Sequence, residues 1–371
     1  MRIAFHAPLK PPDHPVPSGD RRIARLLIEA LRLAGHEVTI ASRLRSRDGA
    51  GDAVRQRRLA ALGARLALRY LRRADPPPEL WFTYHLYDRA PDHLGPPIAR
   101  ALGIPYVVAE ASLAPGRADG AWAGGHESVV AALRQAAAVI GLNPADEAGV
   151  LTVLSDARRY HTLPPFVDLR VFAAPVDRAP VAASLGLDPD QPWLVALAMM
   201  RPGAKLASYR ALAAALAPLA DRRWQLLVIG DGAARPEVAA ALSSLGQRIR
   251  FAGAVLPKAV PGLLGAADLL VWPAIGEAFG MALLEAQAAG LPVVAGASGG
   301  VASLVADNLT GLLAPPGDVA ALSRLIATLL DDPARRQAMG IAARARVAAR
   351  HGLHDAARRL DAILQAARCA S

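Results

Sequence analysis

The chain has 371 residues, of which 53% are hydrophobic and 20% are charged, and its formal net charge is +10. This length exceeds one typical domain and predicts two, each large enough to bury its own core. No apolar run approaches the roughly 20 residues that span a bilayer, the N-terminal apolar stretch is too short for a signal peptide, and a single cysteine excludes a disulfide framework, so a cytoplasmic protein is expected.

The first 145 residues alternate short apolar runs with amphipathic segments. Strands are predicted at 2–5, 37–41, 79–85, 104–112 and 137–143, and the first two flank an amphipathic helix that stops at Gly35. Strands separated by helices predict an α/β domain with a parallel, doubly wound sheet.

The pattern changes near residues 161–192, where prolines cluster without strong periodicity. Beyond them the alternation of strands and helices restarts. We predict an N-terminal domain over 1–172, a linker over 173–192, a second domain over 193–350 and a C-terminal helix over 351–371, for which packing on the first domain is considered. A ligand of such a chain would bind between the domains at the carboxyl ends of the strands.

The stretch "GEAFGMALLEAQAAG" at 276–290 follows a predicted strand and opens a predicted helix. It places Glu277 in the turn and Glu285 about two helical turns further on. Unpaired amides of Phe279, Gly280 and Met281 at the helix N-terminus favour a phosphate, and carboxylates accept hydrogen bonds from sugar hydroxyls. The spacing alone equally allows two solvated acids that interact with the helix dipole.

Residues 250–340 resemble the donor-binding half of the family 4 glycosyltransferases. The matching motifs are "EAFG", "LEAQAAGLPVVA", the pair Gly299–Gly300 and "TGLL", while "VIGDG", "RPGAK" and "SGDRRIARLL" resemble other family segments more weakly. The resemblance implies the GT-B fold, an α/β architecture of two Rossmann-like doubly wound parallel-sheet domains with a cleft between them. It also implies an enzyme, hexosyltransferase-like, that transfers a sugar with retention of configuration.

The resemblance assigns roles to individual residues. Glu277 would contact the donor sugar, Glu285 the ribose, and Arg201 and Lys205 the diphosphate leaving group, where fixed cations stabilise charge that develops in the transition state. Exposed loop cations are the alternative for the two basic residues. The remaining donor-binding candidates are Gly19, Gly253, Ala254, Val255, Ala278, Phe279, Gly280 and Met281. An ordinary helix N-cap at Ser18 or Asp20 is the alternative for the Gly19 loop.

The acceptor side departs from the family pattern. Family members often carry a histidine after the fourth strand, and the matching position here is Ala111. His85 and Glu110 are therefore the acceptor-side candidates, and His6 could face the same cleft. A histidine at a strand end also commonly serves as a structural hydrogen-bonding group.

Three patterns are weak signals. "DPD" at 188–190 lies in a proline-rich segment, so a turn is expected. "GDGAAR" at 230–235 lacks the third glycine and the later acid of a dinucleotide fingerprint. The histidines and the cysteine show no metal-ligand spacing, so no metal is expected.

The stretch 55–73 predicts a basic amphipathic helix. Its arginines are Arg55, Arg58, Arg65, Arg69, Arg72 and Arg73, and its leucines are Leu59, Leu62, Leu66, Leu68 and Leu71. One interpretation is a solvated helix that packs its leucines on the sheet. The other is a surface for anionic lipids. No motif accompanies the charge that would indicate nucleic acid.

The sequence thus predicts a retaining glycosyltransferase that moves a sugar from a nucleotide sugar to an unknown acceptor, in cell-surface glycan or glycolipid synthesis. No cofactor is expected, a UDP-sugar is the expected donor, and a sugar, a lipid-linked molecule or a small molecule would be the acceptor. A peripheral position on the inner face of the membrane is considered. The alternatives are a non-catalytic nucleotide-sugar-binding protein and a GT-B nucleotide-sugar epimerase.

Overall fold

The computed structural model describes residues 1–369, the side chain of Pro115 excepted. The chain divides into two compact units: unit 1 comprises Met1–Pro165 and the C-terminal segment from Leu353, and unit 2 comprises Phe166–Gly352. Within the described residues each unit has one six-stranded sheet, and all strand pairs in both sheets are parallel. The predicted α/β fold with two doubly wound parallel sheets is therefore confirmed.

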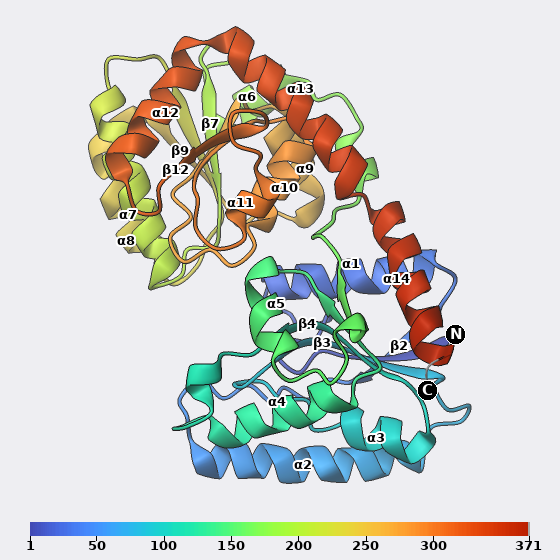
Figure 1. Ribbon diagram of the computed structural model, residues 1–371. Helices are drawn as coiled ribbons and strands as arrows, with labels where there is room; N and C mark the ends of the chain where they lie inside the picture. Colours follow the sequence, from blue (N-terminus) through green and yellow to red (C-terminus); the bar gives the residue numbers. More distant parts are fainter. Residues whose placement is uncertain (370–371) are drawn as a thin grey trace. The chain divides into compact units, whose positions relative to one another are not determined.

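Unit 1 has the strand order β2-β1-β3-β4-β5-β6. The strands are β1 (Arg2–His6), β2 (Glu37–Ser42), β3 (Leu80–Tyr87), β4 (Tyr106–Ser112), β5 (Ala138–Gly141) and β6 (Tyr160–Thr162). The helices are α1 (Gly19–Leu33), α2 (Ala53–Leu71), α3 (Gly95–Leu102), α4 (Ala123–Gln135), α5 (Pro144–Leu151) and α14 (Leu353–Cys369). In Figure 1, α1 and α14 lie on one side of this sheet and α2, α3 and α4 on the other.

Helix α1 begins and ends where its sequence predicts. Ser18 is the N-cap, and its side chain accepts a hydrogen bond from the Arg21 amide at 3.2 Å. Ile23, Leu27 and Leu31 are buried on one face, as an amphipathic helix requires. Helix α14 packs along α1, so the last described helix belongs to unit 1.

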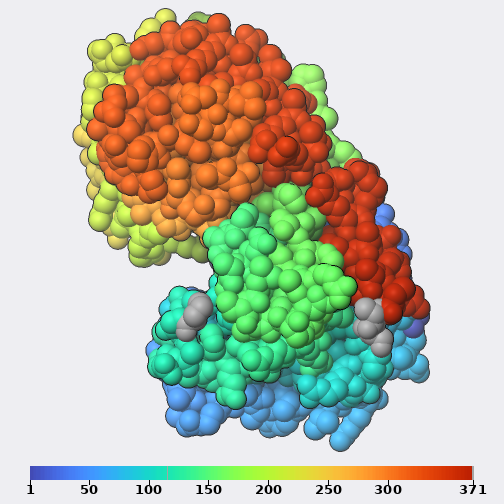
Figure 2. Space-filling view, in the orientation of Figure 1, coloured from blue at the N-terminus to red at the C-terminus, as the bar shows by residue number. Residues whose placement is uncertain are grey.

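Helix α2 is only loosely buried. Gly63 and Ala67 are its buried residues, while Leu62 is 37% exposed and Leu68 is 58% exposed. Leu66 and Leu71 are partly buried against the core of unit 1. The expectation that the leucines pack on the sheet therefore holds for part of them only. Figure 2 shows the blue segment that includes α2 at the surface of unit 1.

Unit 2 has the strand order β12-β11-β10-β7-β8-β9. The strands are β7 (Trp193–Leu197), β8 (Gln225–Ile229), β9 (Ile249–Gly253), β10 (Leu269–Trp272), β11 (Val293–Gly296) and β12 (Gly311–Ala314). The helices are α6 (Arg178–Leu185), α7 (Ala204–Leu216), α8 (Arg235–Leu242), α9 (Val260–Gly265), α10 (Met281–Ala288), α11 (Val301–Leu304), α12 (Val319–Asp331) and α13 (Pro333–Arg350). The central strands are apolar along their whole length because helices cover both faces of the sheet.

The proline-rich segment 173–192, expected to be a linker, lies within unit 2. It contains α6, and the side chains of Ala182 and Leu187 belong to the core of unit 2. The chain crosses from unit 1 to unit 2 at Pro165 and returns at Leu353. The prolines of 173–192 therefore accompany short, packed turns.

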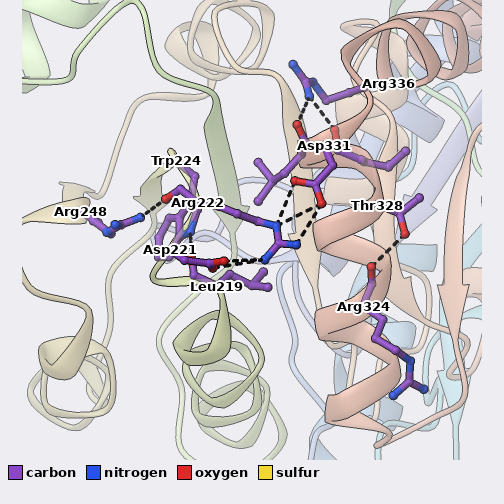
Figure 3. A network of polar contacts seen from close by, with 11 residues as sticks. Leu219, Asp221, Arg222, Trp224, Arg248, Arg324, Thr328, Asp331 and Arg336 are labelled. Carbon is purple, nitrogen blue, oxygen red and sulfur yellow. Dashed lines mark hydrogen bonds and ion pairs between the residues drawn. The ribbon is translucent and has the colours of Figure 1, made fainter.

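One polar network ties α12 and α13 to the turn that precedes β8 (Figure 3). Arg222 donates to Asp331 through Nε and Nη2, both at 3.0 Å to the nearer oxygen, and Arg248 donates to the Arg222 carbonyl at 2.6 Å. Arg336 donates to the Leu329 carbonyl at the end of α12. These contacts precede β8 and therefore lie at the amino-end edge of the sheet, opposite the edge where ligands bind in such folds.

No helix among residues 1–369 combines the length and the apolar character that crossing a membrane requires.

Candidate active site

The strand order of unit 2 identifies where a ligand would bind. β7 lies beside β10, and from β7 the chain runs to β8 and β9 on one side before it returns to β10 on the other. In open parallel sheets, the crevice at the carboxyl ends of two such strands is the usual ligand site. Helices α7 and α10 start at this edge, with Gly203 and Gly280 as N-caps and no side chain bonded to the free amides. Two helix N-termini without a capping side chain form an environment suited to an anion.

Glu277 and Lys205 meet at this edge. The Lys205 ammonium donates a hydrogen bond to Glu277 Oε2, which also accepts one from Trp272 Nε1 at 3.1 Å. The ammonium lies 5.4 Å from the centre of the Trp272 ring, within the range of a cation–π interaction. The carboxylate side chain is 15% exposed and the lysine side chain 31%. The structure therefore holds one carboxylate and one ammonium group in contact, and both side chains are partly exposed.

Helix α7, which carries Lys205, also fixes the loop after β7 and the loop after β10 that carries Glu277. The buried Ser208 hydroxyl accepts a hydrogen bond from the Ile275 amide at 3.0 Å, and the Tyr209 hydroxyl donates to the Ala198 carbonyl at 2.8 Å. The Tyr209 ring also packs edge-on against Trp272, with centroids 5.1 Å apart. The loop after β7 and the loop after β10 are thus held by adjacent residues of one helix.

Glycines let a third loop approach the backbone beside Glu277. A Cβ at Gly299 would lie 2.0 Å from the Glu277 carbonyl oxygen, and a Cβ at Gly300 would lie 2.6 Å from the Ala278 carbonyl oxygen. The Gly300 amide donates to that Ala278 oxygen at 3.0 Å. The glycine pair found in the sequence therefore supports the Glu277 turn.

The "GDG" turn after β8 has a comparable supporting role. A Cβ at Gly230 would lie 1.9 Å from the Ala198 carbonyl oxygen, and a Cβ at Gly232 would lie 2.3 Å from the Met200 carbonyl oxygen. The Met200 amide donates to the Asp231 carbonyl at 2.9 Å. These glycines allow the 230–232 turn to pack on the loop that leads to Arg201.

Arg201 lies on that same loop but is exposed. Its Nη2 is 3.1 Å from Met199 Sδ, and its amide donates to the Met199 carbonyl. The described contacts do not join it to Glu277 or Lys205. Its predicted role at the diphosphate stays a prediction.

The other donor-binding candidates of unit 2 lie at the same edge of the sheet. Gly253 ends β9 with φ +69° and accepts from the Gly230 amide at 2.9 Å, and Ala254 and Val255 follow it. Gly280 is buried with φ +76°, and Ala278, Phe279 and Met281 surround it in the sequence. Glu285 is half-buried on α10, eight positions beyond Glu277.

In unit 1, His85 lies close to both Asp20 and Glu110 at the carboxyl edge of the sheet. β3 and β4 are neighbours, and His85 and Glu110 occupy the same level with φ values of +64° and +60°. Non-glycine residues in this region carry about 1–3 kcal/mol of strain each and concentrate at functional sites. His85 Nδ1 is 3.2 Å from Asp20 Oδ1, and Glu110 Oε2 accepts from the Leu142 amide at 3.2 Å.

His85 shifts the pKa of both Asp20 and Glu110, and both carboxylates shift the pKa of His85. Burial raises the pKa of Glu110 to about 7, although the nearby charge of His85 opposes the rise. Burial alone would lower the pKa of His85, but the Asp20 and Glu110 carboxylates raise it. Burial alone would raise the pKa of Asp20, but His85 lowers it. Tyr84, 1% exposed, has a hydroxyl without a hydrogen-bond partner among the described residues.

His6 and Ala111 lie outside this cluster. His6 is fully buried, and its ring nitrogens contact Asp92 Oδ1 at 3.0 Å and the Leu44 carbonyl at 3.3 Å. Ala111 is buried in the core of unit 1. Neither residue contributes to the cluster of Asp20, His85 and Glu110. Gly19 opens α1, and a Cβ there would meet no atom within 4 Å, so the fold does not itself require this glycine.

Sequence reasoning missed Trp272 and Asp20 as functional candidates. Trp272 is the last residue of β10 and directly precedes the Glu277 loop, which is the signal that could have found it. Asp20 was considered as a helix cap, but Ser18 caps α1 and leaves the Asp20 carboxylate for His85.

The "DPD" segment forms a turn, as predicted. Asp188 Oδ1 accepts a hydrogen bond from the Asp190 amide at 2.9 Å. Among the described residues, no group of three or more His, Cys, Asp or Glu side chains is placed to hold a metal ion.

Two units that each contain a doubly wound parallel sheet are typical of the GT-B class of glycosyltransferases. Residues 185–346 match the family described as "Glycosyl transferases group 1". A GDP-mannose-dependent monoacylated alpha-(1-6)-phosphatidylinositol monomannoside mannosyltransferase from Corynebacterium glutamicum is 34% identical over 266 residues, which cover 65% of this chain and 68% of the relative. The chain belongs to the family 4 glycosyltransferases.

Further similarities agree with this assignment. A D-inositol 3-phosphate glycosyltransferase from Nocardia farcinica is 33% identical over 224 residues, which cover 58% of this chain but only 49% of that relative. The crystal structure of Anabaena HepE in complex with UDP superposes with a TM-score of 0.76 at 17% identity, over 98% of this chain and 100% of HepE, and this likeness shows the fold. The similarities favour neither a non-catalytic binding protein nor an epimerase.

Proposed function

We propose that this glycosyltransferase moves a sugar from a nucleoside diphosphate sugar to an acceptor hydroxyl with retention of configuration. The observation that supports it best is the Lys205–Glu277 pair between the N-termini of α7 and α10. An ammonium and two helix N-termini suit a diphosphate, while a carboxylate suits sugar hydroxyls. The donor would enter between the two charges, and each would gain the partner that its chemistry prefers.

In this proposal the bond from the sugar C1 to the diphosphate oxygen breaks, and the electron pair leaves with the diphosphate. Lys205 and Arg201 neutralise the charge that develops there, which stabilises the transition state more than the bound donor. The acceptor oxygen bonds to C1 on the same face, and its proton passes to the departing phosphate. Glu277 binds hydroxyls of the sugar, and Glu285 binds the ribose.

For the acceptor we propose the Asp20–His85–Glu110 cluster of unit 1, while Gly19 stays a candidate for the donor diphosphate. A carboxyl with a pKa of about 7 can donate or accept a hydrogen bond at neutral pH, and the raised pKa of His85 favours the imidazolium form, in which both ring nitrogens donate. Such a set suits a polyhydroxylated acceptor. The names of the relatives mention a phosphatidylinositol mannoside and inositol 3-phosphate. An acceptor of this kind, a polyol or a glycolipid, is therefore proposed here, and with it a role in cell-surface glycan or glycolipid synthesis.

A donor panel tests the proposal. We expect one of the UDP-, GDP-, ADP- and TDP-sugars, with UDP-sugars first, to stabilise the protein, because a ligand that binds the folded state alone at 100 times its Kd adds about 2.7 kcal/mol. For a unit of this size that corresponds to a Tm increase of roughly 5–10 °C. The donor that stabilises should also be consumed slowly in the absence of an acceptor. If none of the four classes stabilises the protein, the proposed donor chemistry is wrong.

We also propose that α2 binds an anionic membrane surface, which would place the enzyme at the inner face of the membrane. The helix contains no acidic residue, and none of its arginines pairs with a carboxylate within residues 1–369. Val54, Leu62 and Leu68 are exposed on the same helix. Each basic side chain near an anionic surface adds about 1 kcal/mol, and salt screens it.

Sedimentation with phosphatidylglycerol vesicles at low salt tests this surface. We expect binding that Leu68→Ser weakens severalfold. Ile341→Ser is the matched control, because Ile341 is an exposed residue on α13, another arginine-rich helix without acids. No vesicle binding, or equal losses in both variants, would remove α2 from this role.

A further inference from the structure

Unit 1 contains a cavity apart from the cluster of Asp20, His85 and Glu110. It has a volume of about 310 Å³ and lies between the first half of α2, the first turn of α4 and the loop after β3. The lining residues used below are Asp48, Gln56, Arg57, Asp88, Arg89, Gly124 and Gly125. Its volume is at the lower end of the range for small-molecule sites.

The two carboxylates in the cavity wall already have their partners. Asp48 accepts from the Gln56 side chain and the Asp52 amide, both at 2.8 Å, and from the Ala50 amide at 3.1 Å. Asp88 is buried and accepts twice from Arg117 Nη1, at 2.9 and 3.0 Å. Neither carboxylate needs a proton donor or a cation from a ligand.

The two hydroxyls in the wall have also used their protons. Ser46 Oγ donates to the Pro91 carbonyl at 2.6 Å, and Ser128 Oγ donates to the Gly124 carbonyl at 2.8 Å. A ligand therefore finds no free hydroxyl proton here.

The free donors of the cavity come first from the start of α4. Its N-cap is Trp122, no side chain caps it, and its first turn holds no acid. The first helical hydrogen bond runs from the His126 amide to the Trp122 carbonyl, so the amides of Gly124 and Gly125 lack a helix carbonyl to bond. A Cβ at Gly125 would lie 2.0 Å from the Asp88 carbonyl oxygen, which explains the glycine at this position.

Arginines supply the remaining donors. The Arg89 guanidinium stacks over the Trp122 ring at 4.2 Å, and its Nε is buried without a hydrogen-bond partner among the described residues. Arg57 lines the cavity from α2 and forms no ion pair within residues 1–369. A stacked guanidinium is held in one orientation and bonds phosphate through its planar fork.

We propose that this cavity binds the phosphate group of a small polar ligand, with the amides of Gly124 and Gly125 and the guanidinium groups of Arg89 and Arg57 as donors. These backbone amides and guanidinium groups are donors, and two of them are cations, so together they suit a ligand that brings acceptors and negative charge. Phosphate fits amides at a helix N-terminus together with arginine. The ligand class is a phosphate ester, either a soluble polyol or sugar phosphate or the headgroup of a phospholipid. The site does not depend on the proposed sugar transfer, since every group in it belongs to unit 1.

The test uses ¹H–¹⁵N NMR of the full chain, where the Gly124 and Gly125 amides report this cavity and no other site. Titration with glycerol 3-phosphate should shift both signals with a saturable curve, and Arg89→Gln should weaken the affinity at least tenfold. Arg57→Gln should also weaken the affinity for glycerol 3-phosphate. This second variant keeps the test valid if Arg89→Gln disturbs folding. Arg100→Gln is the matched control, because Arg100 bonds Gln135 at the opposite end of α4 and its loss removes the same charge.

The source of the phosphate is decided by a second arm. Vesicles of phosphatidylcholine with phosphatidic acid are sedimented with wild-type protein and with Arg89→Gln. If the protein binds glycerol 3-phosphate but not the vesicles, the ligand is a soluble phosphate ester. If it binds the vesicles and Arg89→Gln removes that binding, the ligand is a lipid headgroup. If tens of millimolar glycerol 3-phosphate moves neither glycine signal and vesicle binding is unchanged in Arg89→Gln, the proposal is wrong. Equal losses in Arg89→Gln and Arg100→Gln would likewise reduce the effect to general charge and overturn it.

Discussion

Glu277→Gln separates the catalytic role of this side chain from its structural role. Glutamine keeps the size and one acceptor oxygen, so Trp272 Nε1 can still donate to it, but Lys205 loses its charged partner. The two paired side chains are only 31% and 15% exposed, so the loss of the charged acceptor should lower the free energy of unfolding by about 1–3 kcal/mol. The variant should therefore still fold, with modestly lower stability.

Sugar transfer should fall strongly in this variant. A contact that strengthens as positive charge develops on the sugar is worth about 2–4 kcal/mol in the transition state, which corresponds to a rate lower by roughly 30- to 900-fold. The free nucleoside diphosphate has no sugar for Glu277 to bind. Its Kd should therefore stay within about threefold of the wild-type value.

The assay combines calorimetry with the nucleoside diphosphate and a rate measurement with the full donor. Glu237→Gln is the matched control, since Glu237 is an exposed acid in the first turn of α8 and should tolerate the change. If Glu277→Gln lowers diphosphate affinity as much as the rate, Glu277 holds the loop and not the sugar. If it behaves like Glu237→Gln, it is a solvated helix-start acid.

Three further variants probe the two units. Glu285→Ala should raise the Kd of the nucleoside diphosphate about tenfold or more in calorimetry while saturated turnover changes little, because a ribose contact acts equally in the ground and transition states; unchanged affinity would refute the ribose role. Burial raises the pKa of Glu110 to about 7 from 4.5, so the folded state holds a proton that the unfolded chain releases, and the free energy of unfolding should fall as pH rises from about 4.5 to 7. In urea titrations at pH 5 and 7.5 this fall should be smaller in Glu110→Gln, and an identical fall would assign the titration to another group. Gly299→Ala should lower donor turnover at least tenfold, because its Cβ would meet the Glu277 carbonyl oxygen and Gly299 has a φ of +54°. Gly317→Ala should leave turnover unchanged, because Gly317 also has a positive φ, +79°, but its Cβ would meet no atom within 4 Å. Equal effects of the two variants would show that backbone strain alone is responsible.

The sheets could be predicted from the sequence because their central strands are continuous apolar runs. β6 has only three residues, and a run of that length lacks a recognisable pattern. Helix α10 starts only at Met281, because Gly280 takes a left-handed conformation that helical residues do not adopt. Proline clustering indicated a linker at 173–192, yet prolines also occur in the packed turns of unit 2 found there.

The site could be predicted in its parts but not in its connections. The sequence indicated Glu277 and Lys205 separately, but their contact spans 72 positions and depends on β7 lying beside β10. The pairing of His85 with Asp20 depends on left-handed backbone at His85, which no local pattern of histidine predicts. Strand order and local strain are tertiary properties, and they arise from packing of the whole unit.

The most direct test of the account is the configuration of the sugar that wild-type enzyme releases from its donor. The donor selected in the thermal-shift panel, α-linked at the diphosphate, is incubated without acceptor, and ¹H NMR follows the anomeric proton of the first sugar released, before mutarotation. Retaining transfer at the Glu277 site predicts that the α-anomer appears first and that Glu277→Gln slows its release. Initial release of the β-anomer, or conversion of the donor into an intact epimer, would contradict the account.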